Sequence, residues 1–482
     1  MSKTGFTMPS HDYIGSPLEG SSLMSKSASP SLLVILILLC SPVRIFAQDN
    51  ETIRQLENLG SYQLQLQEME TRLGRFDHAL IEPLTGIAET SMALNQFDET
   101  RLALDRAIQI TRMSEGLYTD TQFPLLTMMV ENDARRGNWV DANKMLEHLY
   151  WLYTNKHRDI DDSVISELMR LSDFHLEAVA ADSPDQQAYH FRHAANISWL
   201  ALRAAKLLWG ENDPRLAPLQ YNLAKQYYLQ AVAVDKGNRT GYELREVVPG
   251  SSWVRSRQTV KQGFYLTGLR LLRDLRANYT ESNWPDPEAA AIANLYIADW
   301  QLLFTQDSAE SAYKQAYSEL LFSGVEQPAL NSFFATPIVL PEQDYYSSIG
   351  DALVVRQSAS VQPAELQVQN LVRFNAWAPA FPDVEFPLGR ANIRFNDQQD
   401  WGFAMLSFNL GALEKVSRWV DGRYITRISV PDAIEILDQV PQASLELKGL
   451  ADKVHSMHFR PRLINGEAEP VSGTLQYLIP NI

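Results

Sequence analysis

A helix–turn–helix unit that recurs along the chain constrains the possible folds more than any other feature of the sequence. In one copy, over 84–107, two apolar runs with helical spacing flank a turn at Phe97, and in the next, over 126–149, they flank a turn at Trp139. Matched positions keep a constant offset, with Thr100 corresponding to Ala142. A single hairpin of this kind cannot bury its apolar face, so the copies are expected to stack into an array.

The same helical periodicity extends over 50–322, the larger part of the chain. Apolar residues recur at three- and four-residue spacing, and proline and glycine cluster between the runs. Later hairpins are expected over 161–208, 213–279 and 293–316. Asp77 and Asp213, which directly precede helical runs, are predicted to cap them, and the cluster of Asp159, Asp161 and Asp162 is expected to cap the helix that starts near Ser163.

The second helix of each hairpin places small, large and small residues at fixed spacing, as in Ala309, Tyr313 and Ala316. In this pattern and in the aromatic turn residue, the array resembles tetratricopeptide repeats, although its period is longer than the commonest one in that family. The resemblance implies an α-solenoid that binds protein partners. Candidate partner-binding residues then lie on the first helices of the hairpins: Ser91, Asp133, Asn222 and Gln226.

Five prolines interrupt the helical pattern over 323–380. They predict a linker with some extended pieces, of which 336–341 is expected to lie along the last helices. From 381 to the C-terminus the pattern is mixed, and Asn465-Gly466 between strand-like runs predicts a hairpin. Strands are expected over 391–395, 403–410, 422–428 and 473–479, and an amphipathic helix over 445–457.

This helix runs into His458-Phe459-Arg460-Pro461, and Asn465-Gly466-Glu467 and Pro470-Val471-Ser472-Gly473 follow. The order of these motifs resembles the C-terminal domain of TonB-type energy transducers, which implies a small sheet packed by one helix. Upstream the resemblance weakens, and an extra segment over 421–440 precedes the helix. Arg460 and Arg462 alternate on a predicted strand and are expected to face solvent, as part of the domain architecture or as further partner-binding residues.

The N-terminal segment decides the expected compartment. Leu32 to Leu39 form an apolar run that is too short to span a bilayer, which takes about 20 apolar residues. Lys26 precedes the run, and Ala47 stands before a polar stretch, as is typical of a secretory signal. We therefore predict a signal peptide over 1–47, with Met24 as an alternative start, and a periplasmic protein if the source is Gram-negative. Lipidation at Cys40 and an uncleaved membrane anchor remain as alternatives.

Charge and cysteine content exclude several classes of function. With 42 basic and 58 acidic residues the formal net charge is −16, which disfavours nucleic acid and anionic membranes as partners. Cys40 is the only cysteine, so the mature chain would hold no disulfide and no thiolate ligand. The sequence has no glycine-rich phosphate loop, nucleophile elbow or His-Glu-x-x-His motif, so no catalytic, cofactor-binding or metal-binding residue is predicted.

Two clusters contain residue types that can bind metal ions. His190 and His193 share a helix face but lack further ligands nearby, so a solvated or hydrogen-bonded pair is expected. Asp159, Asp161 and Asp162 lack the glycine and the glutamate of a calcium loop. Aromatic residues such as Tyr153 are expected to pack between hairpins or to line a groove for a partner.

The sequence thus predicts a mostly α protein, in which a tetratricopeptide-like α-solenoid precedes a small α+β C-terminal domain. We expect a non-enzymatic exported scaffold or adaptor whose partners are envelope proteins, with no membrane span in the mature chain. The alternative is a TonB-type energy transducer or an accessory of such a system, which requires the N-terminal segment to stay in the membrane. An enzyme with its site in the C-terminal domain is a third hypothesis.

Overall fold

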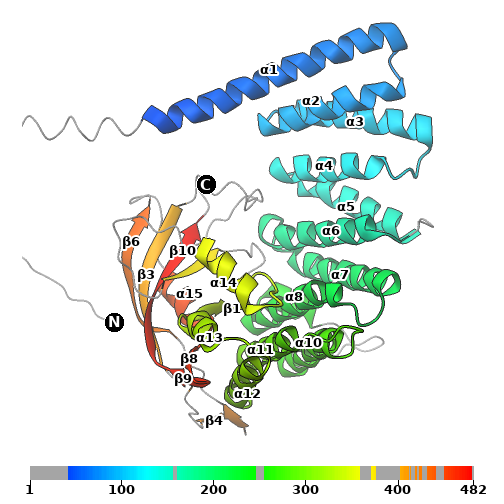
Figure 1. Ribbon diagram of the computed structural model, residues 1–482. Coiled ribbons are helices and arrows are strands. Elements are labelled where there is room, and N and C mark those ends of the chain that lie inside the picture. Colours follow the sequence, from blue (N-terminus) through cyan, green and yellow to red (C-terminus); the bar gives the residue numbers. More distant parts are fainter. Residues whose placement is uncertain are drawn as a thin grey trace, which may run out of the picture.

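The structure is a computed structural model, drawn in Figure 1. It describes residues 42–155, 160–245, 255–358, 371–375, 402–411, 413, 418–420, 423–425, 431–440 and 450–479. The N-terminal residues 1–41, which carry most of the predicted signal peptide and Cys40, lie outside the described residues. In the described part of the chain, no helix is both long enough and apolar enough to cross a membrane.

Stacked helical hairpins form the larger part of the molecule, as expected from the repeat (Figure 1). Each hairpin pairs a first helix with a second helix, and consecutive hairpins pack side by side. The helices are α1 (Pro42–Leu73), α2 (Ile81–Ala93), α3 (Phe97–Glu115), α4 (Gln122–Arg135), α5 (Trp139–Asn155), α6 (Asp162–Ala181), α7 (Gln187–Trp209), α8 (Ala217–Lys236), α9 (Arg239–Leu244), α10 (Arg257–Thr280), α11 (Pro287–Leu303) and α12 (Ala309–Phe322).

Asp77, Asp213 and, from the aspartate cluster, Asp161 cap helical segments. The side chain of Asp161 accepts a hydrogen bond from the backbone N–H of Val164 at the start of α6. Asp77 and Asp213 do the same for the short 3₁₀ turns His78–Leu80 and Pro214–Leu216, which lead into α2 and α8. Local capping chemistry therefore fixes where several hairpins begin.

Two large apolar clusters run through the array and bury the facing sides of the hairpins. Leu104 and Leu146, which occupy matched positions of the two clear repeats, are both fully buried in the N-terminal cluster. Tyr313 and Ala316 are buried in the C-terminal cluster. The small and large positions of the repeat thus serve the packing role that the pattern indicates.

The expected linker over 323–380 is largely a packed structure, so that prediction is corrected. It contains α13 (Gln327–Phe334), β1 (Ile338–Leu340), α14 (Ile349–Ser358) and β2 (Leu371–Asn375), whereas 359–370 and 376–380 lie outside the described residues. Leu340 joins the C-terminal cluster of the array, and Pro341 lies against α8 and α11. The expectation that 336–341 lies along the last helices is therefore confirmed. Pro328 lies in the first turn of α13, and Pro341, directly after β1, is buried.

The C-terminal part is a small sheet with one helix, as the second resemblance implied. A four-stranded sheet has the order β2-β10-β3-β6, in which β10 pairs parallel with β2 and antiparallel with β3. Its apolar face packs on α15 (Leu450–Ser456), on β1 and on β7. The strands are β3 (Gly402–Leu410), β6 (Asp432–Val440), β7 (His458–Arg460), β8 (Arg462–Ile464), β9 (Glu467–Glu469) and β10 (Val471–Ile479).

Two details of this part test the sequence predictions. Asn465 and Gly466, with φ of 51° and 84°, form the turn of the β8–β9 hairpin, as predicted. Within the strand expected over 422–428, β5 (Arg423–Ile425) is present and pairs with β4 (Arg418–Val420), whereas 422 and 426–428 lie outside the described residues. The strand expected over 391–395 lies outside the described residues.

One close approach between α10 and α11 generates a prediction. A Cβ atom added at Gly268 would lie 2.0 Å from the buried ring of Trp300. We expect Gly268→Ala to lower the free energy of unfolding by about 1–3 kcal/mol, because the indole has no room to move. Chemical denaturation of the two proteins measures the change.

Gly263 on the same helix provides the matched control, because a Cβ there would meet no atom within 4 Å. Gly263→Ala should leave stability unchanged or raise it by up to about 1 kcal/mol, through helix propensity alone. Equal effects of the two substitutions would contradict the packing argument.

Candidate functional site

A buried arginine joins the C-terminal domain to the helical array. Arg460, on β7, is 2% exposed, and its Nε donates a hydrogen bond of 3.0 Å to Asp299 Oδ1 on α11. Its Nη2 pairs with Asp299 Oδ2 and, at 2.5 Å, with Glu342 Oε1. The expectation that Arg460 faces solvent is therefore wrong, because two carboxylates from elsewhere in the chain draw it into the interface.

The network around Arg460 balances its charges. Arg356, on α14, pairs with Glu342 at 3.3 Å, so two guanidinium groups face two carboxylates. Burial raises the pKa of Glu342, but Arg460 and Arg356 outweigh it and hold that pKa below its ordinary value. Tyr313 adds a hydrogen bond of 2.7 Å to Asp299 Oδ1. Charges buried without partners would be costly, and here each has one.

The chain that leads from β1 to α14 lies on the first helices α8 and α11. Tyr221 donates a hydrogen bond of 2.8 Å to the carbonyl of Glu342, and Lys225 donates to the carbonyl of Gln343. Tyr296 contacts the carbonyl of Asp344 at 3.3 Å. Burial lowers the pKa of Lys225 to about 8. These side chains therefore donate hydrogen bonds to main-chain carbonyls, as the side chains of a peptide-binding groove do.

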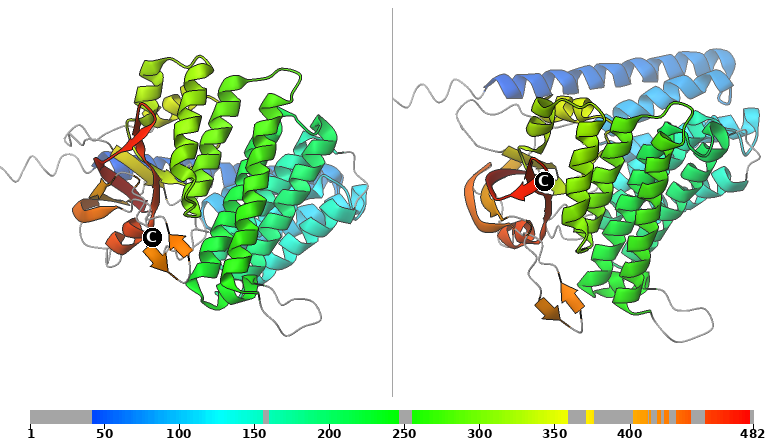
Figure 2. Two further views of the ribbon diagram at one scale, coloured as in Figure 1. Left: turned by 90° about the horizontal axis from the view of Figure 1, so that it is seen from below. Right: turned by 60° about the horizontal axis from the view of Figure 1, so that its bottom comes forward.

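We call this side of the array the inner face and define it by residues on the first helices. They are Thr85 and Glu89 on α2, Thr127 and Glu131 on α4, Arg170 and Phe174 on α6, Tyr221 and Lys225 on α8, and Tyr296 and Asp299 on α11. The C-terminal domain lies against the last helices of the array, beside α8 and α11 (Figures 1 and 2). Among the described residues, none of the C-terminal domain is seen to cover α2, α4 or α6 in the same way.

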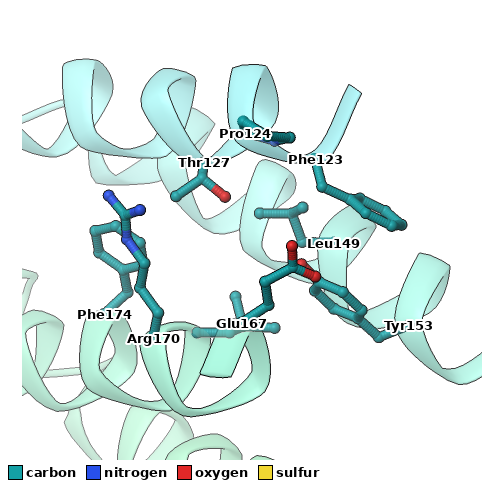
Figure 3. A pocket seen from close by; sticks show the side chains of 9 residues that line it. Phe123, Pro124, Thr127, Leu149, Tyr153, Glu167, Arg170 and Phe174 are labelled. Atoms are coloured by element: carbon teal, nitrogen blue, oxygen red, sulfur yellow. The ribbon is translucent and has the colours of Figure 1, made fainter. Parts of the chain in front are cut away.

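The open part of the inner face holds a pocket between α4 and α6 (Figure 3). Its volume is about 100 Å³. Buried Leu149 and Leu171 lie at its base, and the ring centroids of Phe123 and Tyr153 on one wall are 4.7 Å apart. Pro124, Thr127, Glu167, Arg170 and Phe174 complete the lining. The aromatic Tyr153, noted in the sequence, thus lines a cavity.

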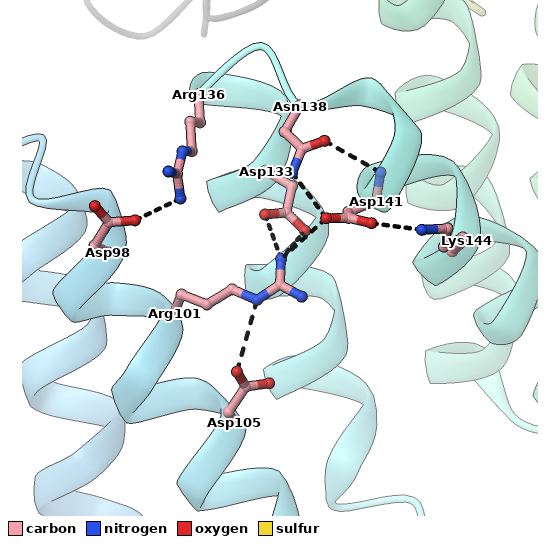
Figure 4. Close-up of polar contacts among 8 residues, drawn as sticks. All are labelled: Asp98, Arg101, Asp105, Asp133, Arg136, Asn138, Asp141 and Lys144. Atoms are coloured by element: carbon pink, nitrogen blue, oxygen red, sulfur yellow. Dashed lines mark hydrogen bonds and ion pairs between the residues drawn. The ribbon is translucent and has the colours of Figure 1, made fainter.

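Two predicted groove residues point away from the inner face. Asp133 is fully buried and accepts two hydrogen bonds of 2.7 Å from Arg101 on α3 (Figure 4). Burial raises the pKa of Asp133 despite that partner. Ser91 is also fully buried. Each lies two residues beyond an inner-face glutamate, Glu131 or Glu89, and two residues turn an α-helix by about 200°.

The remaining candidates differ in their surroundings. Gln226 is 2% exposed and donates hydrogen bonds to Ser172 and Ser198, so it joins neighbouring hairpins inside the array. Asn222 and Arg462 are half-buried. The structure therefore brings Arg460 alone among the six candidates into the interdomain site. Sequence reasoning missed Tyr221, Lys225 and Tyr296. Tyr221 and Lys225 each lie one residue before a candidate on α8. Tyr296 lies on α11, for which no groove-facing side was predicted.

The histidine pair proposed from spacing belongs to a buried polar chain between α6 and α7. His190 Nε2 lies 3.0 Å from Asp182 Oδ2, and its Nδ1 lies 3.0 Å from His175 Nδ1. The close contact between the two Nδ1 atoms leaves room for one proton, and burial lowers the pKa of His175 well below its ordinary value. The ring of His193 stacks against that of His175, with centroids 5.3 Å apart. His190 is hydrogen-bonded, as expected, whereas His193 makes ring contacts.

Over the described ranges, no group of three His, Cys, Asp or Glu residues is arranged to hold a metal ion. The charges of the interdomain network are paired, although Arg460 Nη1 is buried without a hydrogen-bond partner among the described residues, and His190 and His175 of the histidine chain contact one another. The cavity that Tyr296, Glu342 and Arg460 line has a volume of only about 10 Å³, about what a single water molecule needs. The pocket on the inner face is accordingly the feature best placed to receive another molecule.

Comparison with known proteins adds little. No protein-family model matches the sequence, and no curated protein matches it. Among solved structures, the chain is similar to that of BtubC (BKLC) from P. vanneervenii, with a TM-score of 0.32 and 16% identity over 57% of this chain and 94% of that chain. A similarity of this size carries no argument about function.

The Arg460 network predicts a large effect of a single substitution. Arg460→Met leaves the buried carboxylates of Asp299 and Glu342 with one cation between them. We expect the free energy of unfolding to fall by about 3–5 kcal/mol, the usual result of removing one partner from a buried ion pair. Denaturant titration of the purified protein checks this.

Two further variants distinguish the loss of charge balance around Glu342 from the loss of the arginine side chain itself. Adding Asp299→Asn to Arg460→Met restores the balance around Glu342 and Arg356, and should recover part of the loss. Arg462→Met, two residues along and half-buried, should cost less than about 1 kcal/mol. If Arg462→Met costs as much as Arg460→Met, the network is not what holds the interface.

The histidine chain predicts how stability depends on pH. The pKa of His175 is lowered in the folded state, so the unfolded chain binds its proton more readily and stability falls as pH drops below about 6.5. Between pH 7.5 and 5.5 this group alone should remove about 1.4 kcal/mol. His175→Asn should shrink the loss of stability over that interval by this amount, measured by denaturation at each pH. An unchanged pH dependence in the variant would show that His175 is free to titrate in the fold.

Proposed function

We propose that this protein is a non-enzymatic scaffold that works in the cell envelope. Its helical array receives a segment of a partner protein on the open part of the inner face, and its C-terminal domain contributes a second, fixed surface. The observation that carries the proposal is the division of the inner face. The first helices α8 and α11 hold the chain's own residues 342–346, whereas nearer the N-terminus a pocket lies between α4 and α6.

The occupied part supports the proposal by analogy within the same molecule. There, side chains from first helices bind an extended segment through its carbonyl groups, and Pro341 fits between α8 and α11. Stacked repeats place equivalent faces side by side, so the neighbouring helices offer the same kind of surface to an extended chain. The network of Arg460 keeps the C-terminal domain fixed while that surface stays accessible.

The proposed compartment rests on the N-terminal sequence. Export through a cleaved signal would give a periplasmic protein, and a retained segment would leave it anchored in the membrane, as the transducer alternative requires. Mass spectrometry of the protein isolated from its own host distinguishes the two. A mature N-terminus at Gln48 would support the scaffold and remove the transducer, whereas an intact N-terminal segment would favour an anchored form.

The binding surface has its own test in the native host. A photoreactive amino acid at Thr127, on the rim of the pocket, should form cross-links to a defined partner. The same group at Leu207, which is 73% exposed on the second helix α7, should not. The measurement is the set of adduct masses for each position in the exported, full-length protein.

The comparison of Thr127 with Leu207 distinguishes specific binding on the inner face from non-specific cross-linking. Adducts that form at Thr127 and disappear when Tyr153→Arg fills the pocket with charge would support partner binding on the inner face. Adducts that are equal at Thr127 and Leu207, or absent at both, would overturn the proposal.

A further inference from the structure

The pocket between α4 and α6 has the size and lining for one apolar side chain. Its base is leucine, and Phe123, Tyr153 and Phe174 stand around it (Figure 3). An apolar cavity of roughly 150 Å³ holds a benzene molecule. A volume of about 100 Å³ therefore suits an aliphatic side chain such as leucine, isoleucine or methionine. Burial of such a side chain away from water is favourable, so it can anchor a segment.

The surface around the pocket is acidic. Glu89 on α2 is exposed, and Glu177 on α6 lies about two helical turns beyond Arg170, near the carboxylate of Asp173. Within the described residues, no cation forms an ion pair with Glu89 or Glu177. Arg170, at the rim, is already engaged with Glu131 at 3.6 Å and lies over the ring of Phe174. Among the described residues, Glu89 and Glu177 thus leave negative charge on the inner face that no ion pair neutralises.

The titration of Glu177 is consistent with this excess. Burial raises its pKa to about 7, and the nearby carboxylate of Asp173 adds to the shift, while Arg170 opposes it only in part. A carboxylate in such surroundings is stabilised when a cation approaches. A lysine or arginine of a bound segment would supply the positive charge that the groove itself lacks.

The pocket is continuous with a surface that already binds an extended chain. Lys225, next along the inner face on α8, donates to the carbonyl of Gln343, and its charge also acts on Asp173 of α6. The occupied and open parts therefore meet between α6 and α8. A segment lying on α2, α4 and α6 would extend the same groove in which the chain's own residues lie.

We propose that the open inner face binds a basic, extended segment of a partner protein, with one aliphatic side chain in the pocket between α4 and α6. This inference rests on the proposed scaffold function and names the chemistry of its partner. A second copy of the chain fits poorly, because its net charge of −16 would meet an acidic surface. Charge complementarity therefore selects a cationic partner over self-association.

Binding of defined peptides to the full-length protein tests the chemistry directly. The probe is a short fluorescent peptide of lysine and serine with one central leucine, followed by fluorescence anisotropy at low and at physiological salt. It should bind, and raising the salt should weaken it. Replacing its leucine by serine should weaken binding about tenfold or more. A counterpart with glutamate in place of lysine should not bind.

Variants of the protein identify the surface. Glu89→Gln together with Glu177→Gln should weaken binding about fivefold at pH 8, where Glu177, with its pKa of about 7, is mostly ionised. Asp274→Asn together with Asp307→Asn removes the same charge from exposed positions elsewhere and should change nothing. Thr127→Phe, which fills the pocket from its rim, should abolish the preference for the leucine-containing peptide.

Several outcomes would overturn the inference. They are no binding of the basic peptide, equal binding of the peptides with and without leucine, binding of the acidic peptide, or equal losses in the two double variants. A dimer in light scattering that Thr127→Phe dissociates would assign the surface to a second copy instead. If cross-links at Thr127 persist in the host while the basic peptide fails to bind, the scaffold stands and only the proposed partner chemistry is wrong.

Discussion

The ion-pair network of Arg460 is the interaction on which the arrangement of the two parts depends. Asp299 comes from α11, Glu342 and Arg356 from the segment beyond the array, and Arg460 from the C-terminal domain. In a low-dielectric interior each of these charges needs a partner from another element. Separating the domain from the array would expose all of them to a different environment at once. The domain is therefore held in a single orientation, which an apolar contact alone would specify less sharply.

That orientation decides which part of the array remains available. β7 contacts α11 and pairs with β1. The chain that follows β1 therefore lies across α8 and α11, where Tyr221, Lys225 and Tyr296 bind its carbonyl groups. The first helices nearer the N-terminus are left with their own pocket. One buried network thus has two consequences, a closed half and an open half of the same face. Their juxtaposition suits a protein that holds one segment permanently and another reversibly.

Much of the fold could be predicted from local rules. The offset between Thr100 and Ala142, the caps at Asp161 and Asp213, and the Asn465-Gly466 turn each depend on residues close in sequence, and each is found as expected. The groove residues depend on rotation about the helix axis, where an error of two positions reverses the direction of a side chain. Ser91 and Asp133 fell on the buried side for this reason. Periodicity identifies a helix more reliably than it identifies which of its two outer faces meets solvent.

The interdomain contacts lay beyond sequence reasoning for a different reason. Arg460 and Asp299 are 161 positions apart, and neither carries a local pattern that points to the other. An arginine that alternates along a strand has the same signature whether it faces water or a buried carboxylate, since strand periodicity reports only the side of the sheet. What distinguishes the two cases is the second protein surface, here α11. A polar residue on the surface of a domain can therefore face solvent or an interface with another part of the chain. Which of the two it faces depends on the rest of the fold and not on the local sequence.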